Sequence, residues 1–117
     1  MSPLAHAVYE ILRSRTSLPE PRITYAQLAG QLRQISEEFA YVHHRSRPLY
    51  PALGEVGREC RRLGLPPLPA LVVRADTRRP GAAYFAGKST GSAHGGDRVA
   101  AWWWDLEAVK RATYPPR

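Results

Sequence analysis

The histidines and one glycine-rich segment are the parts of this 117-residue chain that catalysis or metal binding would most readily use. His43 and His44 are adjacent, and adjacent helical residues point about 100° apart, so the pair does not converge on one metal ion. Residues 87–90, Gly-Lys-Ser-Thr, are similar to the end of a phosphate-binding loop but lack the earlier glycine of that motif. His94 follows Ser89 in a segment too rich in glycine to hold a base beside a nucleophile. We expect no enzyme activity, no metal site and no cofactor.

Arginine is the residue type whose number and placement indicate a function. The chain has 17 basic and 10 acidic residues, a net charge of +7, and 15 of the basic residues are arginine. Residues 41–80 contain eight arginines and three acidic residues, a net charge of +5. Guanidinium groups bind phosphates and guanine in a bidentate manner. A GC-rich coding sequence would also raise the arginine content, but the concentration of charge in one stretch favours nucleic-acid binding.

Capping residues and apolar spacing predict the helices that would carry these arginines. Ser2 is an N-cap for a helix over 3–15, and Thr24 begins a capping box for a helix over 25–34. A helix over 49–63 is predicted by apolar residues at intervals of four, three, four and three, namely Leu49, Leu53, Val56, Cys60 and Leu63.

The helix over 49–63 also contains two glycines and the single cysteine of the chain. Gly54 and Gly57 weaken a helix by about 1 kcal/mol each relative to alanine, which indicates that something approaches its backbone closely. Cys60 lies on the apolar stripe, so we expect it in the core and not as a nucleophile. A lone cysteine also excludes an internal disulfide. The predicted core includes Leu12, Leu28, Leu32, Leu53, Val56, Cys60, Val72 and Trp103.

The remainder of the first 86 residues is predicted to be a short helix and a hairpin. Ser36 resembles a helix start, with Phe39, Val42 and His43 facing inward. The apolar run 70–73 predicts a buried strand, and 82–85 a return strand. The turn at 75–81 places Arg78 and Arg79 at the tip of that hairpin.

The C-terminal part is predicted to be a tryptophan-rich helix over residues 97–117, which follows a flexible loop at 87–96 and packs on the same domain. Asp97 would cap this helix. Three consecutive tryptophans cannot all face the core, so we expect Trp104 to project outward. Trp104 and Tyr114 would then form the surface for a second copy of the chain or for another protein partner. The face predicted to be buried contains Val99, Trp102, Trp103, Leu106 and Val109.

These elements predict an α+β fold, a winged helix-turn-helix over residues 1–86 with a basic β-hairpin wing and an added C-terminal helix. In such a fold the helix over 49–63 enters the major groove of DNA and the wing tip lies over phosphates. The interval between the second helix and the basic helix is longer than the three or four residues of a typical helix-turn-helix. The predicted DNA contacts are Arg58, Arg61 and Arg62 on the helix and Arg78 and Arg79 on the wing.

Short motifs over about residues 8–87 resemble the C-terminal winged-helix domain of alkylguanine-DNA alkyltransferases and alkyltransferase-like proteins. The matching segments are Ile-Thr-Tyr-Ala-Gln-Leu-Ala at 23–29, Ala-Leu-Gly at 52–54, Pro-Ala-Leu-Val-Val at 69–73 and the stretch 81–84 with the glycine at 87. The resemblance implies a winged-helix fold and contact with DNA.

The same resemblance implies that alkyl transfer does not occur. The family's acceptor cysteine stands in a Pro-Cys-His-Arg-Val motif, and here Ala70 takes the place of that cysteine. The arginine that replaces a flipped base in the family would fall at Pro51. Tyr25 matches the tyrosine that helps to turn out the nucleotide, so the resemblance makes it a DNA contact.

The expected function is non-catalytic binding of double-stranded DNA. The alternative is a protein-interaction module that uses the winged-helix fold, for instance a mobile-element regulator or an inhibitor of a nucleic-acid machine. No apolar run approaches the roughly 18 residues of a membrane span, and residues 1–10 do not resemble a secretory signal. We therefore expect a cytoplasmic protein without membrane contact, located in the bacterial nucleoid if it binds DNA.

Overall fold

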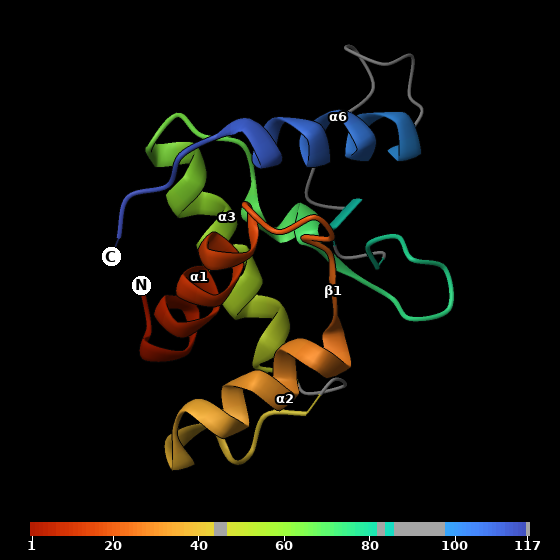
Figure 1. Ribbon diagram of the computed structural model, residues 1–117. Helices are drawn as coiled ribbons and strands as arrows, with labels where there is room; N and C mark the ends of the chain where they lie inside the picture. The colour runs from red at the N-terminus through yellow and green to blue at the C-terminus, as the bar shows by residue number, and fades with distance from the viewer. Residues whose placement is uncertain (44–46, 82–83, 86–97, 117) are drawn as a thin grey trace.

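The computed structural model, which describes residues 1–43, 47–81, 84–85 and 98–116, contains four α-helices of 11 to 14 residues and a small two-stranded sheet (Figure 1). Helices α2 and α6 lie at opposite ends of the molecule, with α1 and α3 between them. The elements in chain order are α1 (Pro3–Arg15), β1 (Ile23–Thr24), α2 (Tyr25–Ile35), η1 (Glu37–Phe39), α3 (Leu49–Arg62), η2 (Leu68–Leu71), β2 (Val72–Val73) and α6 (Arg98–Arg111).

Local signals in the sequence set the ends of the first three helices. The Ser2 hydroxyl accepts a hydrogen bond from the Ala5 amide at 3.1 Å, which satisfies one free N–H at the start of α1. At the start of α2, the Gln27 amide donates to the Thr24 hydroxyl at 3.1 Å and the Thr24 amide donates to the Gln27 side chain at 3.0 Å. Gly64 follows α3 with φ of 71°, a left-handed conformation that favours glycine. The predicted positions of these three helices are confirmed.

The sheet is parallel, and the predicted antiparallel hairpin over 70–85 is wrong. Ile23 pairs with Val72, and Thr24 pairs with Val73. Of the predicted return strand, Tyr84 is helical, as is the residue that follows it, and 82–83 lie outside the described residues. The Tyr84 amide donates to the carbonyl of Gly81 at 3.2 Å, a local turn that replaces a strand ladder.

The predicted strand over 70–73 is shorter than expected for a reason visible in the sequence. Residues 68–71 form the 3-10 helix η2, and Pro69 stands in its first turn, where a missing N–H costs no hydrogen bond. Only the last two residues of the predicted strand, Val72 and Val73, extend and pair with β1. The finding is an α-rich domain with a minimal sheet.

The core lies between α1, α2, α3 and η2, and α6 covers η2 from the other side. Of the predicted core, Trp103 is wrong, because 45% of this residue is exposed. Trp102 is buried in its place, and its indole N–H donates to the Ala70 carbonyl at 2.8 Å. Burial is confirmed for the other seven, Leu12, Leu28, Leu32, Leu53, Val56, Cys60 and Val72.

The segment between α2 and α3 contains one short 3-10 helix. The Ser36 hydroxyl accepts from the Glu38 amide at 3.2 Å and so starts η1, as the sequence indicated. Phe39 and Val42 are buried as predicted. His43 is exposed, so its predicted inward orientation is wrong. The loop predicted at 87–96 and the predicted cap at Asp97 lie outside the described residues.

Candidate nucleic-acid interface

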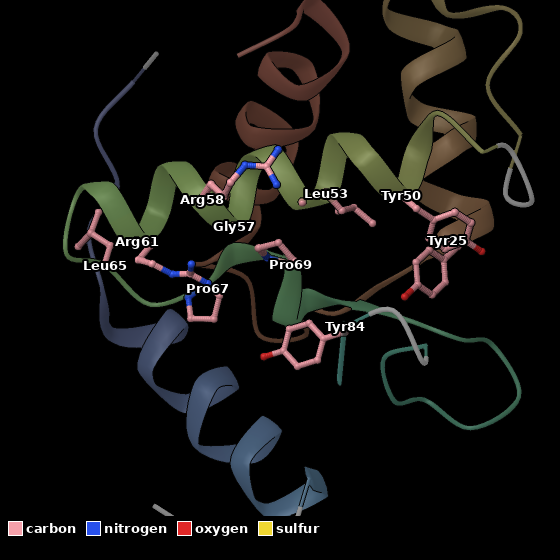
Figure 2. Close-up of a pocket in the computed structure, with 11 residues that line it drawn as sticks. Tyr25, Tyr50, Leu53, Gly57, Arg58, Arg61, Leu65, Pro67, Pro69 and Tyr84 are labelled. Atoms are coloured by element: carbon pink, nitrogen blue, oxygen red, sulfur yellow. The ribbon is translucent and has the colours of Figure 1, made fainter. Parts of the chain in front are cut away.

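A cavity of about 460 Å³ lies along one side of α3 and is bounded by the start of α2, by η2 and by Tyr84 (Figure 2). We call this cavity the α3 groove. Tyr25 and Tyr50 lie side by side at one end of it, and Arg61 and Leu65 lie at the other. The complete lining is Tyr25, Tyr50, Leu53, Gly54, Gly57, Arg58, Arg61, Leu65, Pro67, Pro69 and Tyr84.

Helical geometry explains which arginines of α3 reach the groove. Successive residues are rotated by about 100°, so residues 50, 54, 57, 58 and 61 gather on one side while the apolar stripe faces the core. Arg62 is rotated away from Arg61, and its Nε donates to Oε1 of Glu59 at 2.6 Å. Arg58 and Arg61 line the groove, and Arg62 does not.

The two groove arginines are available to an external anion. Within the described part of the chain, neither Arg58 nor Arg61 has a carboxylate within salt-bridge distance. Arg58 and Arg61 are both exposed and lie at the edge of a partly apolar cavity. Guanidinium groups in this position can donate to phosphate oxygens.

Three tyrosines provide the aromatic surface of the groove. The rings of Tyr25 and Tyr50 have centroids 5.9 Å apart at an angle of 47°. Tyr50 is 42% exposed, whereas Tyr25 is more buried, and this burial raises its pKa. Tyr84 donates its hydroxyl hydrogen to Asp105 of α6 at 2.5 Å, and burial together with this carboxylate raises the pKa of Tyr84. The phenols of Tyr25 and Tyr84 are therefore neutral at physiological pH and do not repel an anion.

The two glycines of α3 form the floor of the groove, and the fold itself does not require them. A Cβ atom at position 57 would lie 3.9 Å from Cγ of Pro69, and one at position 54 would lie 3.5 Å from the nearer guanidinium nitrogen of Arg58. Both are ordinary van der Waals distances, and both residues have ordinary helical conformations. Because glycine destabilises a helix interior, its presence at Gly54 and Gly57 is better explained by the space it leaves in the groove.

A turn rich in arginine lies beside the groove. We call residues 74–81 the basic turn. It is closed by two backbone hydrogen bonds of 2.9 Å, from the Arg74 amide to the Arg79 carbonyl and from the Arg78 amide to the Arg74 carbonyl. The Arg74 guanidinium pairs with Asp76 at 2.8 Å, and the backbone N–H of Gly81, at the end of the turn, donates to the Tyr25 hydroxyl. The turn therefore carries positive charge close to the aromatic end of the groove.

The predicted DNA contacts separate into three groups in the structure. Tyr25, Arg58 and Arg61 come together in the α3 groove. Arg62 and Arg78 form ion pairs instead. Arg62 pairs with Glu59 on its own helix, and Arg78 pairs at 3.7 Å with Glu20, which lies in the loop before β1. Arg79 is exposed on the basic turn and, among the described residues, has no acidic partner.

Two of the three groove tyrosines, Tyr50 and Tyr84, were not predicted from the sequence. Tyr50 precedes Gly54 by four residues and so lies on the same side of α3, a spacing that could have identified it. Tyr84 had no such signal, because its place in the groove depends on the contact between its hydroxyl and α6.

The two residues predicted as a partner surface differ in exposure. Trp104 is 64% exposed, in agreement with its predicted outward position, and Trp103 lies beside it on the surface. Tyr114 is buried, so its predicted place on that surface is wrong. Its hydroxyl donates to the Pro66 carbonyl at 2.5 Å, and its ring meets the edge of Tyr9, which ties the C-terminal segment to the core.

Ala70, at the position of the acceptor cysteine in the alkyltransferase resemblance, is fully buried beneath Trp102. In the described part of the chain no group of three or more potential ligands could hold a metal ion. None of the described helices has the length and apolar character needed to cross a bilayer. No family model, curated protein or solved structure matches the chain.

Proposed function

We propose that this protein binds double-stranded DNA without catalysis, through the α3 groove. The observation that carries the proposal is the combination in one cavity of three tyrosines, a glycine floor and two arginines that have no carboxylate within salt-bridge distance among the described residues. The arginines provide phosphate contacts, which supply most of the affinity of a DNA-binding protein. The tyrosines and the open helix backbone allow the sugar-phosphate chain to approach closely. The resemblance of residues 8–87 to a DNA-binding domain agrees with this assignment.

The experiment compares arginines of one helix that differ only in their surroundings. The affinity of a fluorescent 20-base-pair duplex is measured by anisotropy between about 50 and 300 mM salt. Replacing Arg58 and Arg61 by alanine should weaken binding at least tenfold and reduce the salt slope by about 1.8, because each phosphate contact contributes about 0.9. The matched control Arg62→Ala should change affinity less than about twofold, since Arg62 faces away from the groove and pairs with Glu59. Equal losses in the two variants, or no salt dependence in the natural chain, would contradict the proposal.

A second candidate function is protein binding through α6, favoured by the adjacent exposed side chains of Trp103 and Trp104. Large aromatic side chains are the residues that most often anchor protein interfaces. Light scattering at moderate salt should then show a dimer, formed by a second copy of this chain, that Trp104→Ala converts to a monomer. A monomeric natural chain would leave the α3 groove as the only supported site.

A further inference from the structure

The hydroxyl of Tyr25 is already occupied within the protein, which bears on what this residue does. It accepts a hydrogen bond from the backbone N–H of Gly81 at 3.0 Å, between residues 56 positions apart in the chain. The approach is close: a Cβ atom at position 81 would lie 3.1 Å from the same oxygen. Glycine at 81 therefore permits a contact that an alanine would disturb.

This contact fastens one end of the basic turn. At its other end the turn continues from β2, which is fixed by pairing with β1. Between these ends the turn is closed on itself by the hydrogen bonds of Arg74 and Arg78. Because Tyr25 is also the first residue of α2 and lines the α3 groove, its side chain joins the turn directly to the groove.

We propose that Tyr25 is a positioning residue, which holds the basic turn at a fixed place beside the α3 groove so that both contact the same nucleic acid. This inference rests on the proposed DNA-binding function. It differs from the role that the resemblance implies, because Tyr25 acts through the turn and not by its own contact with the nucleotide. Arg79, exposed and unpaired among the described residues, is the group that it places.

A double-mutant cycle separates a positioning role from direct contact. Tyr25→Phe keeps the ring in the groove and removes only the oxygen that Gly81 needs. Alone it should weaken duplex binding about three- to tenfold and reduce the salt slope by roughly one, the share of one phosphate contact. In an Arg79→Ala background, Tyr25→Phe should have almost no further effect, because the cation that it positions is gone. Additive losses in the double variant, or an unchanged salt slope in Tyr25→Phe, would overturn the inference.

Two further measurements keep this result interpretable. The Gly81 amide should exchange with solvent faster in Tyr25→Phe than in the natural chain, and an unchanged exchange rate would show that the hydrogen bond does not hold the turn. Tyr41→Phe, which removes a phenol oxygen outside the α3 groove, should leave the affinity and the salt slope unchanged. If the natural chain binds the duplex while Tyr25→Phe behaves like Tyr41→Phe, the inference fails and the proposed function stands. If the natural chain does not bind DNA, both fail.

Discussion

Replacing Gly57 by alanine should make the protein more stable and a weaker binder. Position 57 lies in the middle of α3, where alanine favours the helix by about 1 kcal/mol over glycine. The new Cβ atom would meet only Cγ of Pro69, at 3.9 Å, so no steric cost offsets this gain. For a domain of this size 1 kcal/mol corresponds to a rise of about 4 °C in Tm.

The same methyl group would project into the α3 groove, because Gly57 forms part of its floor. Adding a methyl group where two surfaces pack closely costs about 1–3 kcal/mol, so the affinity for duplex DNA should fall at least about fivefold. Urea unfolding followed by tryptophan fluorescence gives the stability, and anisotropy with the labelled duplex gives the affinity. Opposite signs in the two measurements would be difficult to obtain by any general disturbance of the fold.

Gly30→Ala is the matched control for this prediction. Gly30 lies inside α2, and a Cβ atom there would meet only a guanidinium nitrogen of Arg33, at 3.9 Å. The gain in stability should be similar, and the affinity should not change because position 30 is outside the groove. A Gly57→Ala protein that is stabilised but binds as well as Gly30→Ala would show that nothing approaches the floor of the groove. A destabilised Gly57→Ala protein would refute the packing argument itself.

Two other predictions concern the core and the loop before β1. Cys60→Ser should lower the free energy of unfolding by about 1–3 kcal/mol, because it buries a hydroxyl where a thiol now packs. Burial also raises the pKa of the Cys60 thiol, so this thiol should not react with a disulfide reagent in the native protein. The Arg22 hydrogen bond lowers the pKa of Glu20 below 4.5 in the folded state, so its contribution to stability is present above the unfolded pKa and is lost as the pH falls through the folded pKa. Glu20→Gln should therefore flatten the acidic limb of the curve of stability against pH, and a curve identical to that of the natural chain would contradict this assignment.

The helices were predictable because their signals are local. The caps at Ser2 and Thr24 and the glycine after α3 fix helix ends through contacts within a few residues. The parallel sheet was not predictable in this way, because Ile23 must find Val72 across 49 positions of sequence. An apolar run such as 70–73 predicts that the segment is buried, but it does not predict which other segment it pairs with.

The register of α6 could not be read from its sequence either. Apolar residues surround this helix on several sides, so the tryptophans allow more than one core face. The hydrogen bond from the Trp102 indole N–H to the Ala70 carbonyl determines which tryptophan is buried, and it leaves Trp103 exposed to solvent. Tyr114 is drawn inward in the same manner by the carbonyl of Pro66. In both positions a single backbone acceptor, distant in sequence, decides which aromatic ring is buried.

The arginines show how far charge alone can locate a site. A count along the sequence treats Arg61 and Arg62 as equivalent, although Glu59 stands three residues before Arg62, a spacing that favours an ion pair on a helix. That pair could have been predicted, whereas the pair of Arg78 with Glu20 joins residues 58 positions apart and could not. Residues 41–80 have a net charge of +5, but ion pairs occupy several of their guanidinium groups. Among the described residues, only a few guanidinium groups of this stretch remain available to bind an external anion. Because Arg58 and Arg61 are groups of this kind and both line the α3 groove, that groove, and not the whole basic stretch, is the surface on which the DNA-binding proposal depends.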